Sequence, residues 1–120
     1  MEKYKLFDAE FKFMSIIWEA EPLTTRRLTE LCEDKLGWKR TTTYTVLRKL
    51  SDRGMLLSVN STVSSIVKRE QVQQYESQVV VEKAFAGSLP KFIAAFLNDK
   101  TLSDAEAEEM KGLIDRHKGA

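Results

Sequence analysis

Residues 38–54, WKRTTTYTVLRKLSDRG, decide the fold. The segment predicts a helix from Thr41 to Arg53 that stops at Gly54, because a glycine just past the last turn is a typical C-terminal signal. Its inner face would consist of Thr43, Val46, Leu47 and Leu50. The outward positions are Thr41, Thr42, Tyr44, Thr45, Arg48, Lys49 and Asp52. Threonine and tyrosine are mediocre helix formers, so helix propensity does not explain this face, whereas hydroxyls and cations suit hydrogen bonding to phosphates and base edges.

The same segment carries the sharpest concentration of positive charge in the chain. The chain as a whole has 120 residues and a net charge of +1. Between Trp38 and Gly54 the only acid is Asp52, and the net charge is +4; the cations are Lys39, Arg40, Arg48, Lys49 and Arg53. Such a patch can bind a polyanion even when the whole protein is nearly neutral. The alternative is an ordinary solvated helix face.

Two helices are predicted before this segment. The first begins at Asp8 and ends at Glu21-Pro22, because the residue before a proline avoids the helical region. Its apolar stripe would be Phe7, Phe11, Met14, Ile17 and Trp18. The second begins at Thr24 or Thr25 and ends at Gly37, with Leu28, Leu31 and Cys32 on its inner face.

The pattern changes after Gly54. Residues 55–67 contain many β-forming side chains around a turn at Asn60-Ser61-Thr62, which predicts a two-stranded hairpin. Three further helices are predicted at about 69–86, 88–97 and 103–117. Ser88 would cap the second of these, and Ser103 with Glu106 forms a capping-box pattern at the third.

The element order predicts a mainly α fold with a small β-hairpin. Three helices followed by a hairpin are the winged helix-turn-helix order, in which the helix before the hairpin enters the DNA major groove. We therefore expect a winged helix-turn-helix DNA-binding domain at 1–70 and a helical dimerisation region at 71–120. The tail carries more apolar surface than a solvated appendage would expose. The expected dimer-interface residues are Val79, Phe85, Leu89, Phe92, Ile93, Phe96, Leu97 and Leu113.

Composition argues against most other classes. With one cysteine, Cys32, and one histidine, His117, the chain cannot form an internal disulfide or a cysteine-built zinc site. It also has no Gly-rich phosphate loop and no HExxH or GxSxG pattern. We therefore expect no enzyme activity, no metal and no cofactor. No apolar run is long enough to span a bilayer and no signal segment opens the chain, so we expect a cytoplasmic protein without membrane partners.

Four stretches in this order resemble the bacterial penicillinase and methicillin-resistance repressors, a family with copper-responsive relatives. They are the opening helix DAEFKFMSIIW at 8–18, the helix WKRTTTYTVLRKL at 38–50, Gly87-Ser-Leu89 with the short apolar helix after it, and the acidic LSDAEAEE at 102–109. The resemblance spans almost the whole chain. It implies a homodimer that binds a palindromic promoter operator in double-stranded DNA and represses transcription until an upstream signal relieves it. In the antibiotic-resistance branch that signal is β-lactam-linked, and a regulatory protease cleaves the C-terminal region.

The resemblance also divides the expected DNA-binding residues by role. Thr42 and Thr45 match threonines that approach base edges, and Thr41 lies beside them. Tyr44 would pack on the sugar-phosphate backbone, with a plain surface tyrosine as the alternative. The expected phosphate-holding residues are Lys39, Arg40, Arg48 and Lys49. Trp18 and Trp38 are expected to be structural, Trp38 packing beneath the start of the helix; a DNA-stacking role for Trp38 is the alternative.

Three features depart from the family pattern. The wing, residues 58–65, has no charge, so Lys68-Arg69 are expected to supply the electrostatic grip instead. The C-terminus lacks the cysteine cluster of the copper branch, which argues against copper sensing. The family's Asn-Phe cleavage pair is replaced by Ala95-Phe96, which argues against cleavage by the same rule. A function other than DNA binding stays open at this point, namely a winged-helix module that docks proteins in a transcription or assembly complex.

Overall fold

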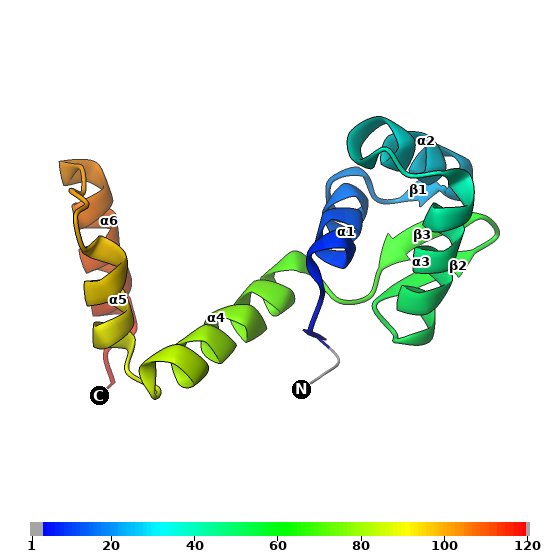
Figure 1. Ribbon diagram of the computed structural model, residues 1–120. Coiled ribbons are helices and arrows are strands. Elements are labelled where there is room, and N and C mark those ends of the chain that lie inside the picture. The colour runs from blue at the N-terminus through cyan, green and yellow to red at the C-terminus, as the bar shows by residue number, and fades with distance from the viewer. Residues whose placement is uncertain (1–3, 120) are drawn as a thin grey trace. The chain divides into compact units, whose positions relative to one another are not determined.

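The computed structural model describes residues 4–119. It contains six α-helices and three short strands within that range (Figure 1). The elements are α1 (Asp8–Ala20), β1 (Leu23–Thr24), α2 (Thr25–Leu36), α3 (Arg40–Asp52), β2 (Leu56–Val59), β3 (Thr62–Ser65), α4 (Arg69–Phe85), α5 (Leu89–Leu97) and α6 (Asp104–Arg116). The predicted fold class, a mainly α winged helix, is confirmed.

The chain divides into two compact units, Met1–Val80 and Val81–Ala120. The boundary lies inside α4 rather than at 70/71, because Val72 is fully buried and belongs to the same core as α1 and α3. Tyr75, one turn further on, places its ring 6.2 Å from that of Tyr4. A fragment that holds the complete first core therefore extends to residue 80.

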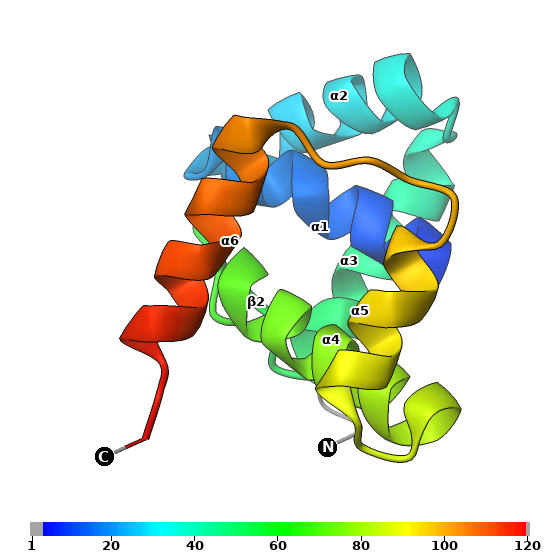
Figure 2. The ribbon, with the colours of Figure 1, turned by 90° about the vertical axis from the view of Figure 1, so that its left-hand side faces the viewer.

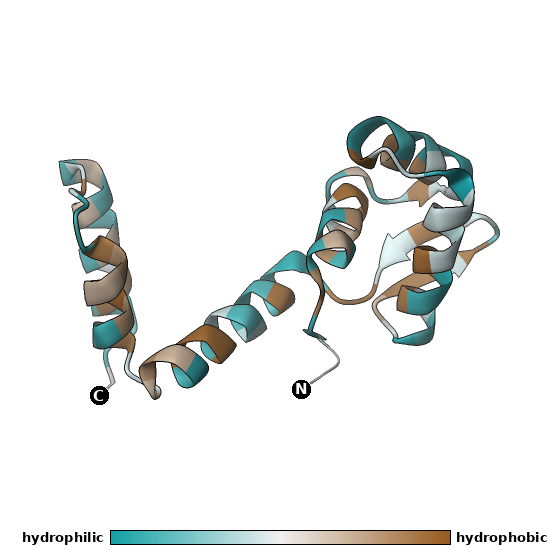
Figure 3. Ribbon diagram, in the orientation of Figure 1, coloured by the Kyte–Doolittle hydropathy of each residue, from teal (hydrophilic) through white to brown (hydrophobic). Residues whose placement is uncertain are grey.

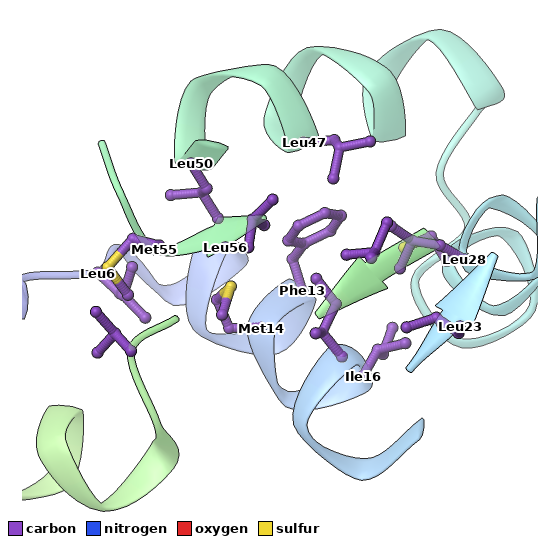
Figure 4. Packing of buried hydrophobic residues seen from close by; sticks show 14 of the residues in the cluster. Leu6, Phe13, Met14, Ile16, Leu23, Leu28, Leu47, Leu50, Met55 and Leu56 are labelled. Atoms are coloured by element: carbon purple, nitrogen blue, oxygen red, sulfur yellow. The ribbon is translucent and has the colours of Figure 1, made fainter. Parts of the chain in front are cut away.

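The first unit is built around one apolar core, to which every helix from α1 to α4 contributes. Its largest fully buried side chains include Phe13, Met14 and Ile17 of α1, Leu28 of α2 and Leu50 of α3. Figure 4 shows Leu47 of α3 pointing toward Phe13 of α1, and Leu50 of α3 belongs to the same buried cluster. Complete burial of one such side chain stabilises the fold by roughly 1.5–3 kcal/mol. The unit therefore fixes α3 by packing along the whole of its inner face.

The sheet is antiparallel with the strand order β1-β3-β2. The hairpin was predicted, and its turn residues Asn60 and Ser61 have φ values of 51° and 61°, as a tight two-residue connection requires. The two-residue strand β1 was not predicted: Leu23 pairs with Val63 and Thr24 with Thr62. A strand of two residues is too short to leave an alternating pattern in the sequence.

Phe7 departs from the prediction. It was expected on the inner stripe of the first helix, but its side chain is 62% exposed. Phe7 precedes α1 and has extended dihedral angles, so it does not follow the helical periodicity of Phe11, Met14 and Ile17. Helix α3 also begins and ends one residue earlier than predicted, at Arg40 and Asp52.

Both tryptophans contact the first core. The Trp18 Nε1–H donates to the Val67 carbonyl oxygen at 3.0 Å, and its ring meets that of Phe11 edge-on at 5.6 Å. Trp38 stacks on Phe13 with ring centroids 5.8 Å apart and an angle of 13° between planes. Trp38 thus lies directly before α3 and against the middle of α1, as its expected structural role requires.

The second unit consists of the end of α4 followed by α5 and α6, which run in opposite directions (Figures 1 and 2). Ser88 and Ser103 cap α5 and α6 by accepting from the backbone N–H groups of Lys91 and Glu106. No residue of α5 or α6 is buried. This unit therefore holds apolar side chains that its own packing does not remove from water.

Candidate nucleic-acid interface

Helices α2 and α3 form a helix-turn-helix whose turn is fixed by Gly37. Gly37 has φ 69°, and its N–H donates to the Glu33 carbonyl oxygen at 3.0 Å. The next N–H, that of Trp38, reaches the Cys32 carbonyl oxygen at 3.3 Å. These bonds close the end of α2 in the manner of a glycine C-cap. The chain then needs only Trp38 and Lys39 before α3 begins.

Helix α3 has one buried face and one exposed face. Thr43, Leu47 and Leu50 are buried and Val46 is half-buried. Every residue predicted to bind DNA is exposed: Lys39, Arg40, Thr41, Thr42, Tyr44, Thr45, Arg48 and Lys49. The helix therefore presents one continuous polar face of hydroxyls and cations, and the core holds the other face.

A shallow hollow of about 240 Å³ lies on this exposed face, bordered by Tyr44, Thr45 and Arg48. The Thr45 Oγ1–H donates to the Thr41 carbonyl oxygen at 2.9 Å. The bond orients the Thr45 side chain, with its methyl group and the lone pairs of Oγ1 left for other partners. Sequence reasoning identified the three residues but not this bond.

The cations of the predicted patch fall into two groups. Lys39, Arg40 and Arg48 form no ion pair within residues 4–119. Lys49 Nζ lies 3.1 Å from Glu10 Oε2, and Arg53 Nη1 lies 3.4 Å from Glu10 Oε1. The charge of +4 counted along residues 38–54 is therefore partly offset by an acid from α1.

Glu10 is a residue that sequence reasoning missed. It was noted only as an acid in the first helical turn, yet it is 5% exposed. Burial alone would raise its pKa, but the Phe7 N–H, which donates to Oε1 at 2.9 Å, and the charges of Lys49 and Arg53 hold the pKa below its usual value. Nothing in the sequence links Glu10 to Lys49, because the two are brought together only by the packing of α1 against α3.

The wing carries apolar and hydroxyl side chains instead of charge. Leu57 and Val59 of β2 are about half exposed, at 49% and 51%. The cations expected to compensate are engaged within the domain. Lys68 Nζ donates to the Ser65 carbonyl oxygen at 2.8 Å, and Arg69 lies 3.7 Å from Glu19 with its guanidinium 5.3 Å from the Trp18 ring. The electrostatic attraction to DNA that was expected from Lys68 and Arg69 is therefore weaker.

The second unit contains an apolar cleft between α5 and α6 of about 270 Å³. Phe92 packs edge-on to Phe85 at 5.4 Å and lies 6.2 Å from Phe96. Figure 3 shows the predominantly hydrophobic colouring of α5. The cleft is lined by Phe92, Ile93, Phe96, Leu97, Lys100, Thr101, Leu102, Glu106 and Met110.

The residues predicted for a dimer interface lie at accessible positions. Phe85, Phe92, Ile93 and Leu97 are half-buried, and Val79, Leu89, Phe96 and Leu113 are exposed. Ile114, which is 60% exposed, adjoins Leu113 but was not among the expected interface residues. The four residues of this set that line the cleft are Phe92, Ile93, Phe96 and Leu97.

Two other kinds of site are absent from the described range, residues 4–119. No helix in residues 4–119 is both long enough and apolar enough to cross a membrane. Histidine, cysteine, aspartate and glutamate side chains do not gather in groups suited to a metal ion anywhere in that range. Cys32 is fully buried, and burial raises the pKa of its thiol, as expected for a small hydrophobic residue in a core.

Sequence comparison matches residues 6–116 to the model of the penicillinase repressor family. The chain belongs to the penicillinase repressor family. It is 21% identical over 117 residues to the methicillin resistance regulatory protein MecI of Staphylococcus aureus strain Mu50, covering 94% of this chain and 95% of that protein. It is also 21% identical over 118 residues to the penicillinase repressor of Bacillus licheniformis, covering 95% and 92%. Penicillinase repressor family membership confirms the resemblance found in the sequence and makes this chain a DNA-binding regulator of transcription.

Proposed function

We propose that the protein is a homodimeric repressor that binds a palindromic operator through α3. The observation that carries the proposal is the division of α3 into a buried inner face and an exposed face of hydroxyls and cations. A recognition helix is held from behind by the core and presents side chains to the major groove. The buried inner face of α3 and its exposed polar face support this role.

The eight exposed residues divide by chemistry. Lys39, Arg40 and Arg48 have cationic groups without an ion pair in residues 4–119, so they are suited to neutralise phosphates. Thr42 and Thr45 carry short side chains that approach base edges, and Thr41 lies one turn before Thr45. Tyr44 borders the hollow beside Thr45 and Arg48. From that position it would pack on the sugar-phosphate backbone. Lys49 was also expected to hold phosphates, but its Nζ lies 3.1 Å from Glu10 Oε2, so its contribution to phosphate binding is smaller.

The dimer is proposed from the second unit. Helices α5 and α6 bury no residue of their own, and an apolar cleft separates them. A second copy would cover these side chains and place two winged helices on the same DNA. Joining two half-site contacts makes the second one intramolecular, so that its effective concentration reaches the millimolar range. The DNA-binding and dimerisation roles therefore fall to the N-terminal and C-terminal parts of the chain.

Selection of duplexes from a random-sequence pool by the purified protein tests this function. We expect a palindromic sequence with half-sites about one helical turn, roughly 34 Å, apart. Affinity for the selected duplex should fall steeply with salt, because phosphate contacts release counterions. A protein-docking module would select no DNA sequence, and its DNA affinity would not fall steeply with salt. That result would contradict the proposal.

Relief of repression is proposed to act through the second unit. An upstream signal, β-lactam-linked in the resistance systems that the relatives are named for, would lead a regulatory protease to cut this region. Ala95-Phe96 lies within α5, and Phe96 lines the cleft, so cleavage there would divide the proposed interface. Exposure of producing cells to a β-lactam, followed by immunoblotting, tests for the shortened chain. An intact chain in cells with induced target genes would exclude the proteolytic route.

A further inference from the structure

A buried carboxylate joins α1 to the recognition helix. Glu10 Oε1 accepts from the Phe7 N–H at 2.9 Å and lies 3.4 Å from Arg53 Nη1, while Oε2 lies 3.1 Å from Lys49 Nζ. Glu10 is 5% exposed, so little water competes with these contacts. The carboxylate is therefore held by the start of its own helix, and in turn it holds two cations of the segment that ends α3.

Lys49 belongs to the surface that DNA would approach. It follows Thr42 by seven residues, which places both side chains on the same side of the helix. Its side chain is 57% exposed even though Nζ is paired with Glu10. Nζ also lies 5.9 Å from the centre of the Phe7 ring. Lys49 thus stands at the edge of the proposed interface with its charge directed toward the protein.

Arg53 is held more firmly. Its side chain is 27% exposed, and besides the Glu10 contact it donates through Nη2 to the Lys5 carbonyl oxygen. Lys39, Arg40 and Arg48 differ, because no acid within residues 4–119 lies within ion-pair distance of them. Two of the five cations in residues 38–54 are therefore matched by an internal anion, and three are not.

The difference matters for DNA of any sequence. Each phosphate that a cation neutralises adds about 0.9 to the slope of log affinity against log salt. That contribution carries no sequence information, because it is the same at every phosphate. A cation paired with a buried carboxylate gains less from a phosphate than a cation that faces water.

We propose that Glu10 is a positioning residue that restrains non-specific DNA binding, by holding Lys49 and Arg53 to the domain and leaving the three unmatched cations to contact phosphates. This proposal rests on DNA binding by α3 as the protein's function. It assigns Glu10 a second effect as well: the carboxylate fixes the end of α3, so its loss weakens the base contacts that only the operator provides.

The test is Glu10→Gln in the full-length protein. Glutamine has nearly the same shape and keeps an oxygen for the Phe7 N–H, but it releases Lys49 and Arg53 from an opposite charge. Fluorescence anisotropy would measure affinity for two duplexes over a range of salt concentrations. One is the duplex selected by the wild-type protein, and the other is a scrambled duplex of the same length and composition.

The expected result is a gain for the scrambled duplex. Affinity for the scrambled duplex should rise several-fold, and the salt slope should steepen by about 1, since Lys49 becomes available to neutralise one further phosphate at about 0.9. Affinity for the selected duplex should rise less or fall, so that the ratio between the two duplexes declines. If Glu10 had only a structural role, Glu10→Gln would lower the affinity for both duplexes together, and that outcome overturns the proposal. An unchanged salt slope in a folded variant overturns it as well.

Glu33→Gln is the matched control. Glu33 is exposed on α2 and forms no ion pair within residues 4–119, so its replacement releases no cation. It makes the same change in net charge, so equal slopes for the two variants would show a general charge effect and refute the role of Glu10.

Lys49→Gln and Arg48→Gln provide the test if Glu10→Gln does not fold. With Glu10 present, Lys49→Gln should reduce the slope by clearly less than Arg48→Gln, which should reduce it by about 0.9. Equal reductions would overturn the proposal. If the wild-type protein binds neither duplex, the proposed DNA-binding function is wrong. If the wild-type protein binds but the variants do not behave as expected, only the role proposed for Glu10 is wrong.

Discussion

Replacement of Trp38 by alanine should destabilise the first unit without removing a DNA contact. The Trp38 ring is half-buried and stacks on Phe13 at 5.8 Å. Truncation of a fully buried tryptophan costs about 3–5 kcal/mol, and roughly half of that applies to a half-buried ring. The stacked pair adds about 0.5–1.5 kcal/mol. We therefore expect a loss of about 2–4 kcal/mol, which for a domain of this size lowers Tm by on the order of 10–25 °C.

Intrinsic fluorescence during urea unfolding is the appropriate assay. Trp18 and Trp38 are the only tryptophans in the sequence, and both lie in the first unit, so the signal reports that unit alone. In the alanine variant the remaining signal comes from Trp18, whose indole is bonded to the Val67 carbonyl oxygen in the same core. The midpoint should shift while the slope of the transition stays constant.

Trp38→Phe is the control, because it keeps a ring that can stack on Phe13. It should recover more than half of the lost stability and bind DNA as the wild type does. An unchanged urea midpoint for Trp38→Ala, together with lost DNA binding, would contradict this reasoning and make Trp38 a contact residue.

The remaining predictions concern four other positions of the proposed repressor. Thr45→Ala should change the relative affinities for operator variants by about 1–3 kcal/mol at most. Arg48→Ala should weaken the affinity for all duplexes alike and flatten the salt slope by about one. Competition binding distinguishes these two effects, and a uniform loss of affinity in both variants would contradict the assignment of base reading to Thr45. Phe96→Asp should give a monomer with a folded first unit and operator affinity lower by orders of magnitude; a variant that sediments as a dimer would exclude Phe96 from the interface. Glu10 has a lowered pKa in the folded protein, so its stabilisation is fully present above the unfolded value of about 4.3 and is lost as the pH falls through the folded value. The difference in unfolding free energy between wild type and Glu10→Gln should therefore be constant above the unfolded value and shrink as the pH falls below it. A difference that stays constant into the acid range would contradict the lowered pKa.

The parts of the fold predicted correctly are those with strong local signals. Thr24, Ser88 and Ser103 cap their helices as expected, and Gly37 ends α2. Residues Thr43, Leu47 and Leu50 recur at helical spacing and are buried together. These features depend on neighbours within one or two turns, which is the range over which sequence patterns carry information.

What the sequence did not predict depends on distant parts of the chain. Strand β1 exists because β3 offers it a partner across the domain, and Phe7 is exposed because the helix starts after it. The largest omission is Glu10, which lies in a different helix from Lys49 and Arg53. A charge count along one segment treats those cations as available, whereas packing gives them an anion that the count cannot include.

The hydrogen bond within α3 bears on which bases the protein prefers. The Thr45 hydroxyl proton is committed to the Thr41 carbonyl oxygen, whereas Thr42 has no such bond within residues 4–119. Thr45 therefore meets the groove as an acceptor with a methyl group, which matches the amino group of adenine or cytosine and the methyl group of thymine. It does not offer a proton to the O6 and N7 atoms of guanine. Thr42 keeps its proton and can address either kind of edge, so the base opposite Thr45 should be the more restricted of the two.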